Sequence, residues 1–420
     1  MKYKTYNCNS YNIHTIKTDR FKTAHIEIIF RKNVCKSELA SYTILCDLLT
    51  DSCKKYPTRR EFTMHLEDLY NTFLYGTTTK VGNMFVMNIM SDFISPKYIN
   101  DEAYLNNYLF TIFDIFNNPN TNNNEFDKNK VEINKKRLSE DIKSLEEDGT
   151  RLSIYNALNI MDNNSITACR SHGNIEDIES ITPSSLYKLY KDLYKNNLCD
   201  IFVIGDLDMD KVVEIIKNNF NNNIINNDEV NINVLNKIKK REVKVVEQST
   251  FSQANLVMIY NVDNLSKYEK HNIMPIYNYI VGSGGLNSKL YNEIREKNSY
   301  TYAVDTMFMR YDNIYIIHIS LDNKNVEDTI KLVKKIIKDS ANKLISESDL
   351  EDAKKNLEMA LNMNYDSPVS LINNYLFQII DDLDDLETKI KKLKKVKLEE
   401  ILNVAKKLKL NTTYIMEGEK

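Results

Sequence analysis

The sequence predicts an α+β protein built from two homologous α/β sandwich domains, in which helices cover mostly antiparallel sheets. Three observations support this prediction. Strand-like runs come in hairpin-like groups and do not alternate strictly with helices, which favours antiparallel sheets. Long amphipathic stretches accompany these runs in both halves of the 420 residues. Two strand-like runs of the first half also recur in the second half at a single offset.

The internal repeat is the strongest of these observations. Residues 24–30 align with 254–260, and residues 83–89 align with 313–319, both at an offset of 230 residues. The two halves also end in the same way, with a predicted helix followed by an apolar run. In the first half these are residues 186–194 and 201–205, and in the second half 401–408 and 414–418. A period this long indicates duplicated domains and excludes a solenoid.

The repeat sets the expected domain boundaries. We expect a first domain over residues 1–220, a linker over 221–240 and a second domain over 241–420. The linker is rich in Asn and Lys and has few large apolar residues, which is typical of a connecting segment.

Helices are predicted wherever apolar residues recur every three or four positions. In the last predicted helix of the first half, for example, Ile133, Leu138, Ile142 and Leu145 form such a stripe. The predicted helices cover residues 38–51, 59–70, 101–116 and 126–147 in the first half, and 267–281, 287–297, 326–344, 349–363 and 370–381 in the second.

Composition excludes several function classes. The 56 basic and 59 acidic residues nearly balance, so no broad field favours nucleic acid as a partner. The sequence contains no run of about 18 apolar residues, so it does not predict a membrane-spanning helix. The first residues also lack the apolar stretch of a signal peptide. The six cysteines are scattered, so we expect reduced thiols and a cytoplasmic protein.

Residues 43–47 have the spacing of a metallopeptidase helix without its metal chemistry. In the inverzincin motif H-x-x-E-H, two histidines one turn apart bind zinc and the Glu activates the bound water. These three places hold Thr43, Cys46 and Asp47. A threonine cannot replace a neutral imidazole, and a cysteine cannot serve as the carboxylate base. An active peptidase that uses Cys46 and Asp47 with another metal is the alternative.

Several strings carry a family resemblance. Residues 55–60, 66–70, 173–178, 200–206 and above all 284–297 resemble the pitrilysin/insulinase-type (inverzincin) metallopeptidase family, in particular non-catalytic members of its processing-peptidase branch. The resemblance implies two α+β domains in a clamshell arrangement. It also implies a third metal position on a later helix, where the nearest counterpart is Asp141. None of the six histidines is paired at i, i+4, so we expect no zinc in this chain.

The resemblance also assigns roles in the second half. Family members use an Arg and a Tyr, here Arg295 and Tyr302, to hold the substrate backbone and stabilise the tetrahedral intermediate. Both side chains can donate hydrogen bonds to a developing oxyanion. Gly284 and Gly285 belong to the loop before the helix that bears Arg295, and we expect them to bind substrate. Alternatively, Arg295 makes a salt bridge on a helix face and Tyr302 is a packed aromatic residue.

Together these features predict a non-catalytic subunit of a heterodimeric zinc metallopeptidase. It would pair with a homologous chain that keeps H-x-x-E-H and its zinc, and would donate Arg295 and Tyr302 to that partner's site. The substrate would be a peptide that adds a strand to a sheet edge, and the runs 24–30 and 254–260 are the candidate edges. The alternative is a scaffold or peptide-binding protein without any role in proteolysis.

Overall fold

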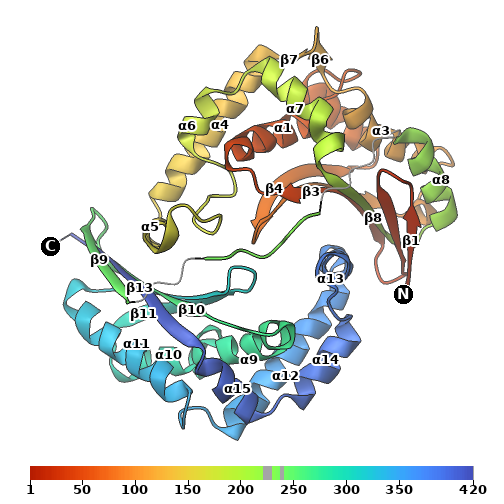
Figure 1. Cartoon of the computed structure of the whole chain (residues 1–420). Coiled ribbons are helices and arrows are strands. Elements are labelled where there is room, and N and C mark those ends of the chain that lie inside the picture. The colour runs from red at the N-terminus through yellow and green to blue at the C-terminus, as the bar shows by residue number, and fades with distance from the viewer. Residues whose placement is uncertain (221–228, 237–240, 420) are drawn as a thin grey trace. The chain divides into compact units, whose positions relative to one another are not determined.

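The computed structural model describes residues 1–220, 229–236 and 241–419, apart from the side chains of residues 194, 196 and 302. The chain forms two compact units (Figure 1). The first unit consists of Met1–Lys143 and Arg170–Ile232, and the second of Ser144–Cys169 and Asn233–Lys420. No helix of the described ranges has the length and apolarity needed to span a bilayer.

The first unit is built on a six-stranded sheet with the order β1-β2-β8-β3-β5-β4. All neighbouring strands are antiparallel except the parallel pair β2 and β8. The strands are β1 (Lys2–Asn7), β2 (Asn12–Lys17), β3 (Thr23–Asn33), β4 (Phe73–Val81), β5 (Met84–Ile94) and β8 (Leu198–Gly205).

Helices pack on this sheet because their apolar faces need to be buried. Helix α1 (Leu39–Asp51) buries residues such as Leu45 and Leu49 and contacts β4, β5 and α7. A capping box between Thr58 and Glu61 starts α2. The other elements are α2 (Arg59–Asp68), α3 (Tyr104–Asn117), the hairpin β6 (Thr121–Asn122) and β7 (Glu125–Phe126), α4 (Lys128–Glu146), α6 (Ile175–Glu179), α7 (Pro183–Asn196) and α8 (Met209–Asn219).

The second unit repeats this topology. Its sheet has the order β11-β12-β10-β13-β9, which matches β4-β5-β3-β8-β2 strand for strand. The one parallel pair, β9 and β13, corresponds to the parallel pair β2 and β8. The strands are β9 (Val243–Gln248), β10 (Ala254–Val262), β11 (Thr301–Met309), β12 (Ile314–Leu321) and β13 (Leu408–Glu417). The predicted fold class of two homologous α+β units is confirmed.

Helices cover both faces of the second sheet. One face lies under α9 (Met274–Asn278), α11 (Val326–Ser340), α12 (Glu347–Met363) and α15 (Leu398–Ala405). The other face packs against α5 (Gly149–Asp162), whose Ala157, Leu158 and Met161 share a core with β10, β12 and β13. This unit also contains α13 (Pro368–Asp381) and α14 (Leu386–Lys395).

Helix α5 marks a difference from the expected division of the chain. The sequence placed everything before residue 221 in one domain, but residues 144–169 cluster with the second unit. The physical reason is non-local: the sheet of the second unit has a second apolar face, and α5 supplies the side chains that cover it. Asn156 also donates a hydrogen bond to the Tyr414 hydroxyl (3.1 Å).

Part of the predicted linker is anchored by buried side chains. Residues 221–228 and 237–240 lie outside the described residues, whereas 229–236 are described. Ile232 is buried and its carbonyl accepts a hydrogen bond from the backbone of Asn83 (2.9 Å). Val234 is buried too, and its N–H donates to the carbonyl of Tyr311 (2.9 Å).

The predicted peptide-binding edges are wrong. Residues 24–30 lie in β3, which pairs with β5 and β8, and residues 254–260 lie in β10, which pairs with β12 and β13. His25 and Glu27 gave β3 the alternation of a half-exposed strand, but both are buried and hydrogen-bonded to each other (3.1 Å). The edge strands are β1 and β4 in the first unit, and β9 and β11 in the second.

Candidate functional site

Thr43 lies where the first zinc-binding histidine is expected. Its hydroxyl donates to the carbonyl of Leu39 (3.0 Å) and lies 2.9 Å from the Thr78 hydroxyl on β4. Thr78 in turn lies 3.4 Å from Nδ1 of His172. These hydrogen bonds can all be donated in one direction. The ring N–H of His172 donates to Thr78, Thr78 donates to Thr43, and Thr43 donates to the carbonyl of Leu39. A chain of neutral hydrogen bonds therefore satisfies this place without a cation.

Cys46 lies where the catalytic glutamate is expected. Its side chain is buried and packs against Gly76 of β4, so closely that a Cβ at position 76 would collide with the sulfur. Burial, and after it the charge of Asp47, raises the pKa of the Cys46 thiol far above its ordinary value. The thiol of Cys46 is therefore protonated near neutral pH, and it cannot serve there as a general base.

Asp47 and Asp141 hold the other two positions that the family resemblance predicts for an active-site set. Burial raises the pKa of Asp47, the charge of Arg137 opposes that rise, and Asp141 adds to it. Asp141 is exposed on α4, and its charge also acts on His172, whose pKa is lowered by burial. The structure therefore brings the four predicted positions and His172 into one neighbourhood.

This neighbourhood does not fit zinc. A structural or catalytic zinc needs three or four deprotonated N, S or O ligands in tetrahedral directions. Here the hydroxyl of Thr43 and the thiol of Cys46 are both committed to other contacts. Among the residues that the structure describes, no group of three or more His, Cys, Asp or Glu side chains is placed to hold a metal ion.

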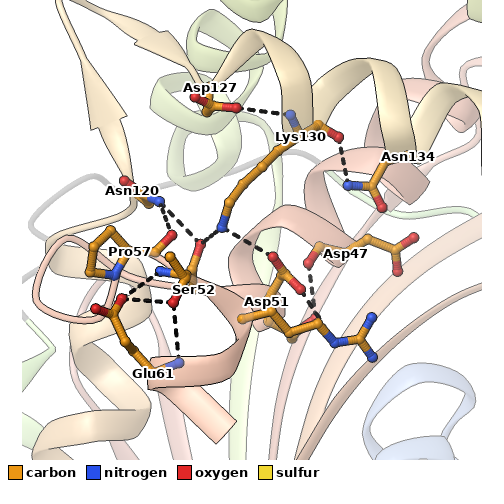
Figure 2. A network of polar contacts seen from close by, with 12 residues as sticks. Asp47, Asp51, Ser52, Pro57, Glu61, Asn120, Asp127, Lys130 and Asn134 are labelled. Carbon is orange, nitrogen blue, oxygen red and sulfur yellow. Dashed lines mark hydrogen bonds and ion pairs between the residues drawn. The ribbon is translucent and has the colours of Figure 1, made fainter.

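A polar network preserves the end of α1. Figure 2 shows the side chain of Lys130 reaching from α4 to Asp51 and Ser52. Its ammonium donates to Ser52 Oγ (2.6 Å) and Asp51 Oδ2 (3.1 Å). Asn120 adds a hydrogen bond to the carbonyl of Pro57 (2.8 Å), just before α2. These contacts tie α1, α2 and α4 together, which explains how the helix persists without a metal.

Arg295 lies beside a cavity in the second unit. It belongs to a π-helical segment (Asn292–Lys297) that continues the short helix α10 (Lys289–Tyr291), whose start is capped by Ser288. The cavity has a volume of about 470 Å³. Polar residues dominate its lining, which consists of Gln253, Arg295, Glu296, Ser299, Tyr300, Thr301, Ser320, Leu321 and Asp322.

The guanidinium of Arg295 is oriented but not buried. It lies 4.9 Å from the ring centroid of Tyr291, and its Nε lies 3.8 Å from a carboxylate oxygen of Glu296. The side chain remains 39% exposed. Because an exposed ion pair of this length contributes little to stability, this arrangement leaves Arg295 able to hydrogen-bond a ligand at the cavity.

Tyr302 lies in β11, one residue after the cavity residue Thr301. The pairing of β11 with β12 shifts register between Thr301 and Ala303, so Tyr302 sits at an irregularity in an edge strand. Its side chain is outside the described part of the structure. The backbone nevertheless brings positions 295 and 302 to the same end of β11.

Gly284 and Gly285 lie in the segment that enters the Arg295 helix. The N–H of Gly284 donates to the carbonyl of Tyr279 (2.9 Å). Gly285 has a φ of +57°, a left-handed conformation that other residues adopt at a cost. Neither glycine is among the described residues that line the cavity. Their expected role in substrate binding stays a prediction.

Comparison with known proteins finds a match to one family. Residues 180–357 match the family model described as Peptidase M16 inactive domain. That match covers less than half of the chain and begins in the first unit. The chain is 22% identical over 413 residues to the probable inactive metalloprotease YmfF of Bacillus subtilis (strain 168), covering 96% of this chain and 95% of YmfF. The predicted resemblance to non-catalytic members of the pitrilysin/insulinase-type family is confirmed.

Solved structures share the fold of this chain. A conserved protein from Enterococcus faecalis V583 superposes with a TM-score of 0.93 at 22% identity, covering 100% of this chain and 99% of that one. A peptidase M16 inactive domain from Pseudomonas fluorescens superposes with a TM-score of 0.79 at 15% identity, covering 100% and 99%. At these identities the likeness establishes the two-domain fold alone.

Three residues of the site were missed in the sequence. Thr78, Lys130 and His172 all contact the degenerate helix or its end, directly or through one hydroxyl. They come from β4, α4 and the loop before α6, so no local pattern connects them. Only the family string that begins at Gly173, next to His172, offered a signal.

Proposed function

We propose that this chain is the non-catalytic subunit of a heterodimeric zinc metallopeptidase. In this proposal a homologous partner chain keeps the H-x-x-E-H motif and binds zinc. The present chain contributes Arg295 and Tyr302 to the partner's site and helps to bind the peptide. The observation that carries the proposal is the contrast between the two units: the metal-binding positions are degenerate, whereas Arg295 remains exposed at a polar cavity.

The chemistry of the cavity supports a role in holding a peptide. A guanidinium offers five N–H donors in a fixed fork and a phenol offers one O–H donor, so both can stabilise an oxyanion or a peptide carbonyl. Thr301 starts the edge strand β11 and lines the same cavity. An extended peptide could pair with such an edge while a carbonyl group points to Arg295.

Co-expression with a homologue that keeps H-x-x-E-H tests the proposal. We expect a stable complex with peptidase activity that neither chain shows alone. Arg295→Ala and Tyr302→Phe in this chain should each lower kcat by roughly 10²–10³-fold, the usual effect of losing one oxyanion donor. Lys297→Ala is the matched control, because Lys297 lies on the same helix, is 65% exposed and pairs only with Glu293 among the described residues.

Two outcomes would overturn the proposal. The first is full activity in the complexes that carry Arg295→Ala or Tyr302→Phe. This result would show that neither side chain acts in the partner's active site. A stable homodimer that binds peptides, together with no complex, would favour the alternative of a scaffold or peptide-binding protein. Gel filtration of each variant complex separates a loss of catalysis from a loss of assembly.

A further inference from the structure

A second cavity in the C-terminal unit combines an apolar wall with two cations. Its volume is about 250 Å³. The apolar side is formed by Pro275, Leu357, Ala360, Leu361 and Leu393, and the polar side by His271, Asn272, Arg310, Asn364 and Lys389. It shares no lining residue with the Arg295 cavity.

The two cations at this cavity are held by neutral acceptors. Arg310, at the turn between β11 and β12, donates from Nη1 to Nδ1 of His271 (3.2 Å). Lys389, on α14, donates to Oδ1 of Asn374 (3.0 Å). Within the described ranges, no carboxylate forms an ion pair with either cation. Burial lowers the pKa of Lys389, and the like charge of Arg310 lowers it further.

The acids around this cavity are already engaged. Asp384 and Asp385 act on the charge of Lys389, but Asp384 pairs with Lys392 and Asp385 caps the start of α14. Asp381 accepts from Nε2 of His271 (3.1 Å) and from the Tyr311 hydroxyl (3.1 Å), and Lys267 lies 3.8 Å from it. Since Nδ1 of His271 accepts from Arg310, its single proton must be on Nε2, so the ring is neutral. Burial and the charge of Arg310 lower the pKa of His271 to about 4, in keeping with this neutral form.

We propose that this cavity binds a small molecule with one carboxylate on an apolar body about the size of a medium-chain acid. The carboxylate would bridge Arg310 and Lys389, and the apolar body would pack against Leu357, Leu361 and Leu393. Charge-assisted hydrogen bonds of this kind are among the strongest in proteins. A mostly apolar pocket with a few convergent polar groups is the usual form of a small-ligand site.

Calorimetric titration of the full chain with octanoate tests the site. We expect saturable binding of one octanoate per chain, and at least roughly tenfold weaker binding of octanamide, which has the same chain but no charge. Lys389→Gln should weaken octanoate binding at least roughly tenfold. Lys391→Gln is the matched control on the same helix, because that side chain is 72% exposed, and it should bind octanoate as the natural chain does.

A second variant tests the shape of the cavity. Ala360→Phe places a ring at the mouth of the cavity without removing a charge, and it should abolish octanoate binding while the thermal unfolding curve is retained. The proposal is overturned if the natural chain does not bind octanoate, if octanamide binds equally well, or if either Lys389→Gln or Ala360→Phe binds octanoate with unchanged affinity.

Discussion

Thr43 Oγ1 on α1 lies 2.9 Å from Thr78 Oγ1 on β4. A second contact joins Thr78 to His172, so an imidazole is present, but it is bound to a hydroxyl group. The helix itself is intact and well buried. At Thr43 the polar side of α1 is satisfied by hydrogen bonds to neutral groups.

Position 76 is predicted to require glycine, because the sulfur of Cys46 lies where a Cβ would be placed. Gly76→Ala adds a Cβ where the sulfur lies, so it should lower the free energy of unfolding by about 1–3 kcal/mol through overpacking. Cys46→Ala in the same chain should recover most of that loss, because it removes the colliding atom. Urea denaturation of the two single variants and the double variant measures the coupling. Additive losses would contradict the assigned contact.

Lys130 is predicted to stabilise the junction of α1 and α4. Lys130→Met removes the hydrogen bond to Ser52 and the ion pair with Asp51. That ion pair is largely shielded from water. The substitution should therefore cost about 1–2 kcal/mol of stability. Lys136→Met on the same helix is the control, since that side chain is 80% exposed and its pair with Glu140 spans 3.8 Å. Equal thermal shifts for the two variants would refute the role given to Lys130.

Asp200 is predicted to govern stability in acid. It is fully buried and accepts from Nε of Arg31 (2.8 Å) and from His14 (3.1 Å). Burial, the largest influence, raises the pKa of Asp200, but His14 and Arg31 outweigh it and bring it to about 2. Since this is below the unfolded value of about 3.9, the stabilisation is present above about pH 4 and is lost as the pH falls toward 2.

Asp200→Asn should therefore destabilise the chain by about 3–5 kcal/mol at neutral pH, because it leaves a buried cation without its partner. The deficit should shrink below about pH 4. The exposed Asp19 provides the control, and Asp19→Asn should change stability by less than about 0.5 kcal/mol. A deficit that stays constant down to pH 2 would exclude this linkage.

His25 is predicted to have the opposite pH dependence. It contacts Asp92 (2.8 Å) and Glu27 (3.1 Å). Burial, the largest influence, lowers the pKa of His25, but the two carboxylates more than compensate and raise it to about 9. Its contribution, on the order of 2–3 kcal/mol, is fully present below about pH 6.5 and is lost as the pH rises through 9.

His25→Gln should flatten the fall in stability between pH 7 and 10. Proton NMR of the imidazole offers a direct measurement, and we expect it to titrate near pH 9. Titration near its ordinary pKa of about 6.5 would show that the two carboxylates do not hold the charged ring.

Local signals in the sequence predicted much of the fold. The 230-residue repeat predicted two units, and β3, β5, β10 and β12 appear where the repeated runs placed them. The predicted helix over 38–51 corresponds to α1. These successes rest on apolar periodicity, which is a property of neighbouring residues.

Long-range pairing accounts for what the sequence did not predict. Residues 24–30 were predicted to form a sheet edge, but His25 in this run contacts Asp92, which lies 67 residues away in the chain on the neighbouring strand β5. Helix α5 contacts a sheet that begins about ninety residues later. Such contacts depend on which distant segments of the chain meet in the fold, and a local sequence pattern does not predict them.

Zinc binding by the purified chain tests the central claim most directly. Equilibrium dialysis followed by elemental analysis measures zinc bound per chain, with a variant that carries Thr43→His and Asp47→His as the positive control. We predict no stoichiometric, tightly held zinc in the natural chain and clear uptake by the variant. Its two imidazoles stand one turn apart on α1 and, with the neighbouring carboxylate of Asp141, supply the three ligands that zinc needs. One tightly bound zinc per natural chain, lost on Asp47→Asn, would contradict the account.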